Sequence, residues 1–154
     1  MTNKSVVGRC GLYCGACSVY RAYKDDGEYL ARLAQHYGCP PEKVRCEGCM
    51  ALTPECWGYG CKIVQCLMDR SLEFCYQCSE YENETCEKFE KLARHYLEDH
   101  GVDLRANLRR IRKGETEEWL IESEEKYRCP ACGKPLSIIA MKSKCYHCGA
   151  DLLK

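Results

Sequence analysis

Large apolar residues are scarce in this sequence. Leu, Ile, Val and Phe together account for 27 of the 154 residues, and Phe occurs only twice. That share lies below the roughly 20% found in chains with an ordinary apolar core. The composition therefore excludes a domain that is held together by hydrophobic packing alone, and with it the usual apolar enzyme core.

Long apolar runs and an excess of one charge are also missing. No stretch approaches the roughly 18 apolar residues of a membrane span, and residues 1–10 lack the apolar segment of a secretory signal. We therefore expect a cytoplasmic protein without a membrane segment. The 23 basic and 23 acidic residues give zero formal net charge. This balance disfavours non-specific binding to nucleic acid, which depends on positive charge.

Cysteine, by contrast, is abundant, with 16 residues in the chain. Such a density indicates either a disulfide framework or metal sites. Because disulfides are rare in a reducing cytosol, we favour metal sites. A structural zinc ion contributes on the order of 10–16 kcal/mol to folding, so a few ions would replace the missing apolar core.

The cysteines divide the chain into three parts. Residues 1–90 hold twelve of them, residues 91–128 hold none, and residues 129–154 hold the last four. We predict a small metal-stapled domain of helices and irregular segments in the first part. The second part is predicted to be a helical hairpin that acts as a linker, and the third a zinc ribbon.

Helical spacing of apolar residues occurs first at residues 18–37, where Asp25, Asp26 and Gly27 predict a break. Residues 44–86 have closely spaced cysteines and turn-forming residues instead. We expect this segment to be irregular and held by cross-links, because long unstructured segments are uncommon in compact domains.

The cysteine-free part predicts three more helices. Residues 87–100 carry one apolar stripe, and Gly101 is a suitable C-terminal stop. Asp103 can cap a second helix, and a third is predicted at about residues 116–127.

The C-terminal cysteines have the most regular spacing. They form two Cys-x-x-Cys pairs, each followed by glycine, and twelve residues separate the pairs. Each pair can form a tight turn that points both sulfurs inward, and four thiolates complete a tetrahedral zinc site. The apolar residues 136–141 would supply a strand between the turns. We therefore predict a rubredoxin-like zinc ribbon of β-hairpins, with redox-active or disulfide-bonded pairs as the alternative. The predicted ligands are Cys129, Cys132, Cys145 and Cys148.

The N-terminal cysteines allow many pairings. Twelve thiols could fill three four-ligand sites, but spacing does not fix which thiols share an ion. Cys10, Cys14 and Cys17 also have the spacing with which radical S-adenosylmethionine enzymes hold a [4Fe–4S] cluster. The chain is too short and too poor in strands for the α/β barrel of those enzymes. An iron–sulfur cluster without that chemistry is an alternative to zinc, because thiolates suit both.

The order of these motifs resembles a known family. The segments CGLYCGACSVY (10–20), CEGC (46–49), CKIVQC (61–66), CYQC (75–78) and CEKF (86–89) are similar to those of the cysteine-rich family catalogued as domain of unknown function 3795. The resemblance covers about residues 8–90. That family is functionally uncharacterised and is regarded as zinc-binding, so the resemblance implies a metal-binding fold and no reaction. The ligands that it implies are Cys10, Cys14, Cys17, Cys46, Cys49, Cys56, Cys61, Cys66, Cys75, Cys78 and Cys86.

Two departures from the family pattern affect the ligand sets. Cys39 has no counterpart, so one site would need a histidine, such as His36 or His95, or fewer protein ligands. The stretch Tyr81–Thr85 before the final cysteine is longer than in the family, which affects the placement of Cys86.

Three functional hypotheses follow. The first is a protein with about three to four structural zinc ions that binds a protein partner. The second is an iron–sulfur redox protein, or a metal-dependent enzyme, that uses an N-terminal cluster. The third is nucleic-acid binding through the ribbon and the basic segment Arg105–Lys113, although the glutamates that follow favour a neutralised surface. No known catalytic motif occurs, which favours a non-enzymatic role.

Overall fold

The structure is a computed structural model, and it describes residues 3–152. Over these residues the chain forms seven α-helices, several short 3-10 turns and no β-strand. Within the same range no helix combines the length and the apolar character that crossing a membrane requires. The helices are α1 (Ser18–Asp25), α2 (Glu28–Tyr37), α3 (Lys62–Asp69), α4 (Ser79–Glu82), α5 (Glu87–His100), α6 (Leu104–Arg112) and α7 (Thr116–Lys126).

The helix ends predicted for residues 18–37 and for the cysteine-free part of the chain are confirmed. α1 and α2 are separated at Asp26 and Gly27, which both have positive φ angles. α5 ends at Gly101, whose φ of 67° is left-handed and favours glycine. Asp103 caps α6, because its side chain accepts the backbone N–H of Ala106 at 3.0 Å.

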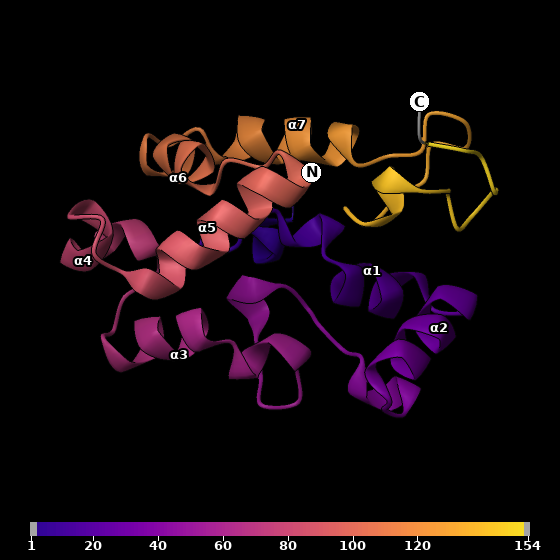
Figure 1. Ribbon diagram of the computed structural model, residues 1–154, viewed down its shortest axis with the longest axis horizontal. Helices are drawn as coiled ribbons and strands as arrows, with labels where there is room; N and C mark the ends of the chain where they lie inside the picture. Colours follow the sequence, from indigo (N-terminus) through magenta and orange to yellow (C-terminus); the bar gives the residue numbers. More distant parts are fainter. Residues whose placement is uncertain (1–2, 153–154) are drawn as a thin grey trace.

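The main hydrophobic core combines buried residues of α1, α2, α3, α5, α6 and α7, and α5 contributes Phe89 to it. In the view of Figure 1, α5 crosses between α3 and the pair α6 and α7. Phe89 of α5, Leu104 and Leu108 of α6 and Leu120 of α7 are almost completely buried. Val7, from the segment before the first cysteine, is buried in the same cluster. The cysteine-free helices therefore share one core with the cysteine-rich part of the chain.

Residues 44–86 are more helical than predicted. They contain α3, which buries Ile63, Val64 and Leu67 on one face. The residue before α3, Cys61, makes no side-chain capping hydrogen bond, so the sequence carries no N-cap signal at this position. The prediction of an irregular segment is wrong for α3 because the cysteine spacing obscures a short amphipathic helix.

The prediction of a rubredoxin-like ribbon of β-hairpins is also wrong. Within the C-terminal part that the structure describes, only isolated bridges join Arg128 to Pro135 and Lys144 to Asp151. The predicted strand does not pair with a hairpin partner, because its backbone N–H groups bond to two separate segments. The N–H of Leu136 donates to the Tyr127 carbonyl, and that of Ile138 to the Ala16 carbonyl, both at 2.8 Å. Residues 140–142 then turn as a 3-10 helix.

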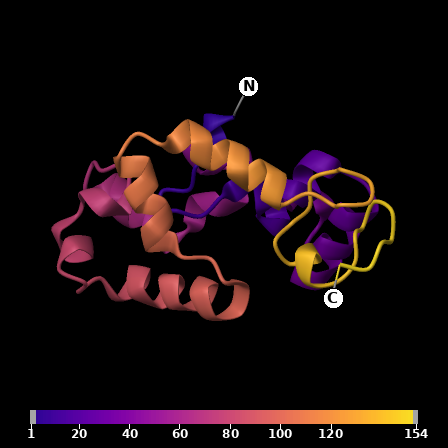
Figure 2. The ribbon, with the colours of Figure 1, turned by 90° about the horizontal axis from the view of Figure 1, so that it is seen from above.

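The C-terminal segment lies against α1 and α2, as both views show (Figures 1 and 2). Tyr146 donates a hydrogen bond to the Asp25 carboxylate at 2.6 Å, and the hydroxyls of Tyr29 and Ser137 are 2.9 Å apart. Its own apolar cluster is small and contains Leu136 and Ala140 besides two cysteines. Contacts with α1 and α2 therefore supply much of the packing of this segment.

The basic helix α6 is bordered by carboxylates. Arg110 forms a two-pronged pair with Glu122 of α7, and Arg112 pairs with Glu82 of α4 at 2.8 Å. Arg105 pairs with Glu90 of α5. These three arginine charges are thus balanced by neighbouring helices.

Candidate metal centre

The four C-terminal cysteines converge on one point. Their sulfurs all lie within 4.8 Å of one another, and the pairs Cys129–Cys148 and Cys132–Cys145 are each 3.7 Å apart. A tetrahedral zinc ion with sulfurs at about 2.3 Å requires sulfur–sulfur distances of about 3.8 Å. The cluster therefore has the size of a tetrathiolate zinc site. Among residues 3–152, no other three Cys, His or carboxylate side chains bring their ligand atoms this close together.

Local backbone geometry builds the cluster. The N–H of Gly133 donates to the Cys129 carbonyl, and that of Gly149 to the Cys145 carbonyl, both at 2.8 Å. Both glycines have positive φ angles, 75° and 78°, which favour glycine at these positions. The backbone N–H of His147 points at the Cys145 sulfur at 3.3 Å. The two Cys-x-x-Cys-Gly segments thus form matching tight turns, as the sequence predicted, although no β-ribbon surrounds them within residues 3–152.

The electrostatics of the cluster favour a bound cation. Hydrogen bonds from the backbone N–H groups of Cys132 and Ala131 lower the pKa of the Cys129 thiol to about 7. The backbone N–H of Ala150 lowers the pKa of the exposed Cys148 thiol, but partial desolvation and hydrogen bonds with the other three cysteines of the cluster outweigh it and raise that pKa to about 11. Four neighbouring thiols cannot all ionise without a counter-charge, and a divalent ion supplies it.

One group of predicted N-terminal ligands surrounds Cys14. A hydrogen bond from Cys14, together with the backbone N–H of Arg9 at 3.5 Å, lowers the pKa of the Cys49 thiol to about 6. Burial, reinforced by the charges of Cys49 and Cys61, raises the pKa of Cys10 to about 12. The fold therefore brings together cysteines from three different sequence motifs.

Cys46 lies near two other predicted ligands. Burial raises its pKa to about 11, and the charges of Cys17 and Cys56 contribute to the shift. The Cys56 sulfur accepts the backbone N–H of Thr53 at 3.4 Å. The remaining predicted N-terminal ligands, Cys66, Cys75, Cys78 and Cys86, line a separate small cavity.

The residues considered for a mixed site lie elsewhere. Cys39 follows α2 and packs partly buried against the main core. His36 is exposed, and His95 is exposed and lies with its Nδ1 2.8 Å from Asp99. Within residues 3–152, neither histidine belongs to a group of three or more ligand atoms that lie within 4.8 Å of one another.

The comparison with known proteins agrees with the motif pattern. The family model described as "Protein of unknown function (DUF3795)" matches residues 6–91. The chain belongs to this family. No curated protein and no solved structure matches it. The C-terminal four-cysteine cluster lies outside the residues that the DUF3795 model matches.

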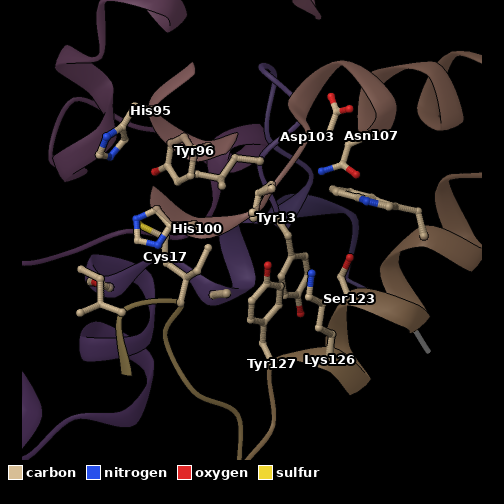
Figure 3. A pocket seen from close by; sticks show the side chains of 18 of the residues that line it. Tyr13, Cys17, His95, Tyr96, His100, Asp103, Asn107, Ser123, Lys126 and Tyr127 are labelled. Carbon is tan, nitrogen blue, oxygen red and sulfur yellow. The ribbon is translucent and has the colours of Figure 1, made fainter. Parts of the chain in front are cut away.

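A larger cavity of about 420 Å³ lies between the DUF3795 domain and the helices that follow it (Figure 3). Tyr96 and His100 of α5 and Lys126 of α7 face it together with Tyr13 and Cys17. Sequence analysis did not identify this cavity, because its lining residues have no common motif or spacing.

Proposed function

We propose that this DUF3795 protein is a zinc-binding protein whose metal ions are structural, and that the C-terminal cluster holds one of them. The observation that carries the proposal is the convergence of four cysteine sulfurs within 4.8 Å. Four protein ligands fill a tetrahedral shell and leave no position for water or substrate, which is typical of structural rather than catalytic zinc.

The spacing of the sulfurs favours a single ion over an iron–sulfur cluster. In a [4Fe–4S] cluster each cysteine binds a different iron atom, so the cysteine sulfurs stand farther apart than around one ion. Sulfur pairs at 3.7 Å are close to the separation that zinc requires. A tetrathiolate iron site has similar dimensions, so metal analysis decides between the two ions.

The size of the local core supports a structural role. The C-terminal segment buries few apolar side chains apart from Leu136 and Ala140. Binding of structural zinc contributes on the order of 10–16 kcal/mol, which is enough to order such a segment. The N-terminal cysteines would bring the total to about three to four ions per chain, in a reducing cytoplasm that keeps the thiols free. Binding of a protein partner, the other half of the first hypothesis, stays a prediction.

Metal analysis of the full chain, purified without oxygen, tests the proposal. The double variant Cys132→Ser/Cys148→Ser should hold one zinc ion fewer than the wild type. His147→Gln is the matched control, because His147 lies between two ligands and its ring bonds to the Pro135 carbonyl at 3.1 Å instead. This control should keep the wild-type zinc content. Iron with equimolar sulfide in the wild type, or an unchanged zinc content in the double variant, would contradict the proposal.

A further inference from the structure

Four cysteines outside the C-terminal cluster line one small cavity. Cys66, Cys75, Cys78 and Cys86 surround a space of about 20 Å³. This is room for about one water-sized sphere. The side chains of Leu67 and Phe89, which are buried in the main core, also line it. Arg70, Glu80 and Lys88 also line it. Four thiols around one small space suit a single soft metal ion.

The elements around this cavity come together at one end of the molecule, where α3, α4 and α5 meet (Figure 1). Cys66 lies in α3, and Cys86 directly precedes α5. Cys75 and Cys78 bracket a 3-10 turn closed by the Cys78 N–H, which donates to the Cys75 carbonyl at 3.1 Å. This arrangement is a Cys-x-x-Cys turn facing two single cysteines from two helices.

The long stretch Tyr81–Thr85 does not move Cys86 away from the other three cysteines. α4 and a turn take up the extra residues, and the Thr85 N–H donates to the Glu80 carbonyl at 2.9 Å. Cys86 therefore returns to the cavity that Cys75 and Cys78 line.

Two basic side chains and one carboxylate, Glu80, lie beside the four thiols. Arg70 Nη1 donates to the Cys78 sulfur at 3.0 Å, and Lys88 also lines the cavity. Cys86 stands at the N-terminus of the 14-residue helix α5, where the helix dipole favours negative charge. A tetrathiolate zinc site carries a charge of roughly −2. The two basic side chains offset this charge, although Arg70 is shared with Glu80 at 2.8 Å.

We propose that Cys66, Cys75, Cys78 and Cys86 form a second metal centre that binds one zinc ion. The inference rests on the proposed function only in that thiolates of this chain hold zinc. It fixes a ligand set that spacing alone left open, and it assigns this part of the DUF3795 domain a single ion. The four sulfurs do not all lie within 4.8 Å of one another in this structure, so zinc binding would draw them together, to about 2.3 Å from the ion.

Two double variants of the full chain separate this centre from the C-terminal one. Cys75→Ser/Cys86→Ser should lose one zinc ion and keep the C-terminal ion, whereas Cys132→Ser/Cys148→Ser should show the reverse. The combination of all four substitutions should lose two ions. Zinc per chain is measured by native mass spectrometry, which also reports whether each variant is folded through its charge-state distribution.

Alkylation of the wild-type chain keeps the test valid if a variant unfolds. In the zinc-loaded protein the four thiols should react slowly with iodoacetamide, and a competing chelator should expose all four together. Reaction of these thiols at the same rate with and without zinc would overturn the second centre. An unchanged zinc content in Cys75→Ser/Cys86→Ser, together with a loss in Cys132→Ser/Cys148→Ser, would overturn it while leaving the proposed function intact. Iron with sulfide that disappears in Cys75→Ser/Cys86→Ser would also overturn it.

Discussion

The rings of Tyr29 and Tyr146 stack with centroids 4.0 Å apart and planes 3° from parallel. Tyr29 belongs to α2, and Tyr146 lies between the last two cysteines of the C-terminal cluster. Each hydroxyl makes a hydrogen bond across the same contact, Tyr29 with Ser137 and Tyr146 with Asp25. This pair holds the turn between Cys145 and Cys148 against the helices of the DUF3795 domain.

Tyr146 substitutions should show how strongly this contact holds the C-terminal segment. Tyr146→Phe keeps the stack and removes the bond to the Asp25 carboxylate, so we expect the free energy of unfolding to fall by about 1.5–3 kcal/mol. Tyr146→Leu should lose about 0.5–1.5 kcal/mol more, because the ring pair is also lost. Urea unfolding of the full chain measures both changes. Equal stability of Tyr146→Phe and the wild type would show that the bond contributes nothing net.

Gly11, in the first cysteine motif, should not tolerate a side chain. Its φ is +93°, and a Cβ atom would lie 2.5 Å from the Leu104 carbonyl oxygen and 2.9 Å from Leu108 Cγ. Asn107 also donates to the Gly11 carbonyl at 2.9 Å, which holds the segment against α6. Gly11→Ala should therefore lower the free energy of unfolding by more than about 1 kcal/mol.

Gly60→Ala is the control for Gly11→Ala, because nothing lies within 4 Å of its added Cβ atom. We expect its unfolding free energy to stay within about 0.5 kcal/mol of the wild type in the same urea titration. Equal effects of the two substitutions would mean that the close contact between Gly11 and α6 is absent in solution.

Local signals predicted the cysteine-free helices well. Gly101 ends α5 and Asp103 caps α6, because both effects act within one or two turns of the chain. The same locality explains the matching turns that end at Gly133 and Gly149. These features need only neighbouring residues, and so the sequence alone is enough to predict them.

Features that depend on distant segments could not be predicted. The ribbon prediction failed because the Ile138 N–H bonds to the Ala16 carbonyl, which is remote in the sequence. Cys66 and Cys86 line one cavity only because α3 and α5 pack together. Cysteine spacing gives the number of thiols, whereas helix packing determines which thiols lie together.

The buried side chain of Phe89 should contribute more to the free energy of unfolding than an exposed side chain of the same helix, α5. It is fully buried, and the Arg105 guanidinium lies 5.0 Å from the centre of its ring. Phe89→Ala should lower the free energy of unfolding by about 3–5 kcal/mol, since it opens a cavity in a small core. Leu97→Ala is the matched control on the same helix, because Leu97 is 54% exposed. Its cost should be within about 0.5 kcal/mol. If the two variants lowered the free energy of unfolding by similar amounts, α5 would not bury the face that carries Phe89.

His100, at the end of α5, should make the stability of the protein depend on pH. Burial lowers its pKa below 6.5, and the positive charges of Lys142 and His95 contribute, while Asp99 opposes them. Its Nδ1 atom is buried and has no hydrogen-bond partner. The folded state thus favours neutral His100, so its contribution to stability is complete above the unfolded pKa of about 6.5.

As the pH falls through the lowered pKa of His100, that contribution is lost, because the unfolded chain takes up the proton more readily. We expect wild-type stability to fall between pH 7.5 and 5.5 relative to His100→Gln, which cannot be protonated. Comparing the two proteins by urea unfolding at each pH cancels the protonation of thiolates, which both share. A constant difference between wild type and His100→Gln across this range would mean that His100 titrates alike in the folded and unfolded chains.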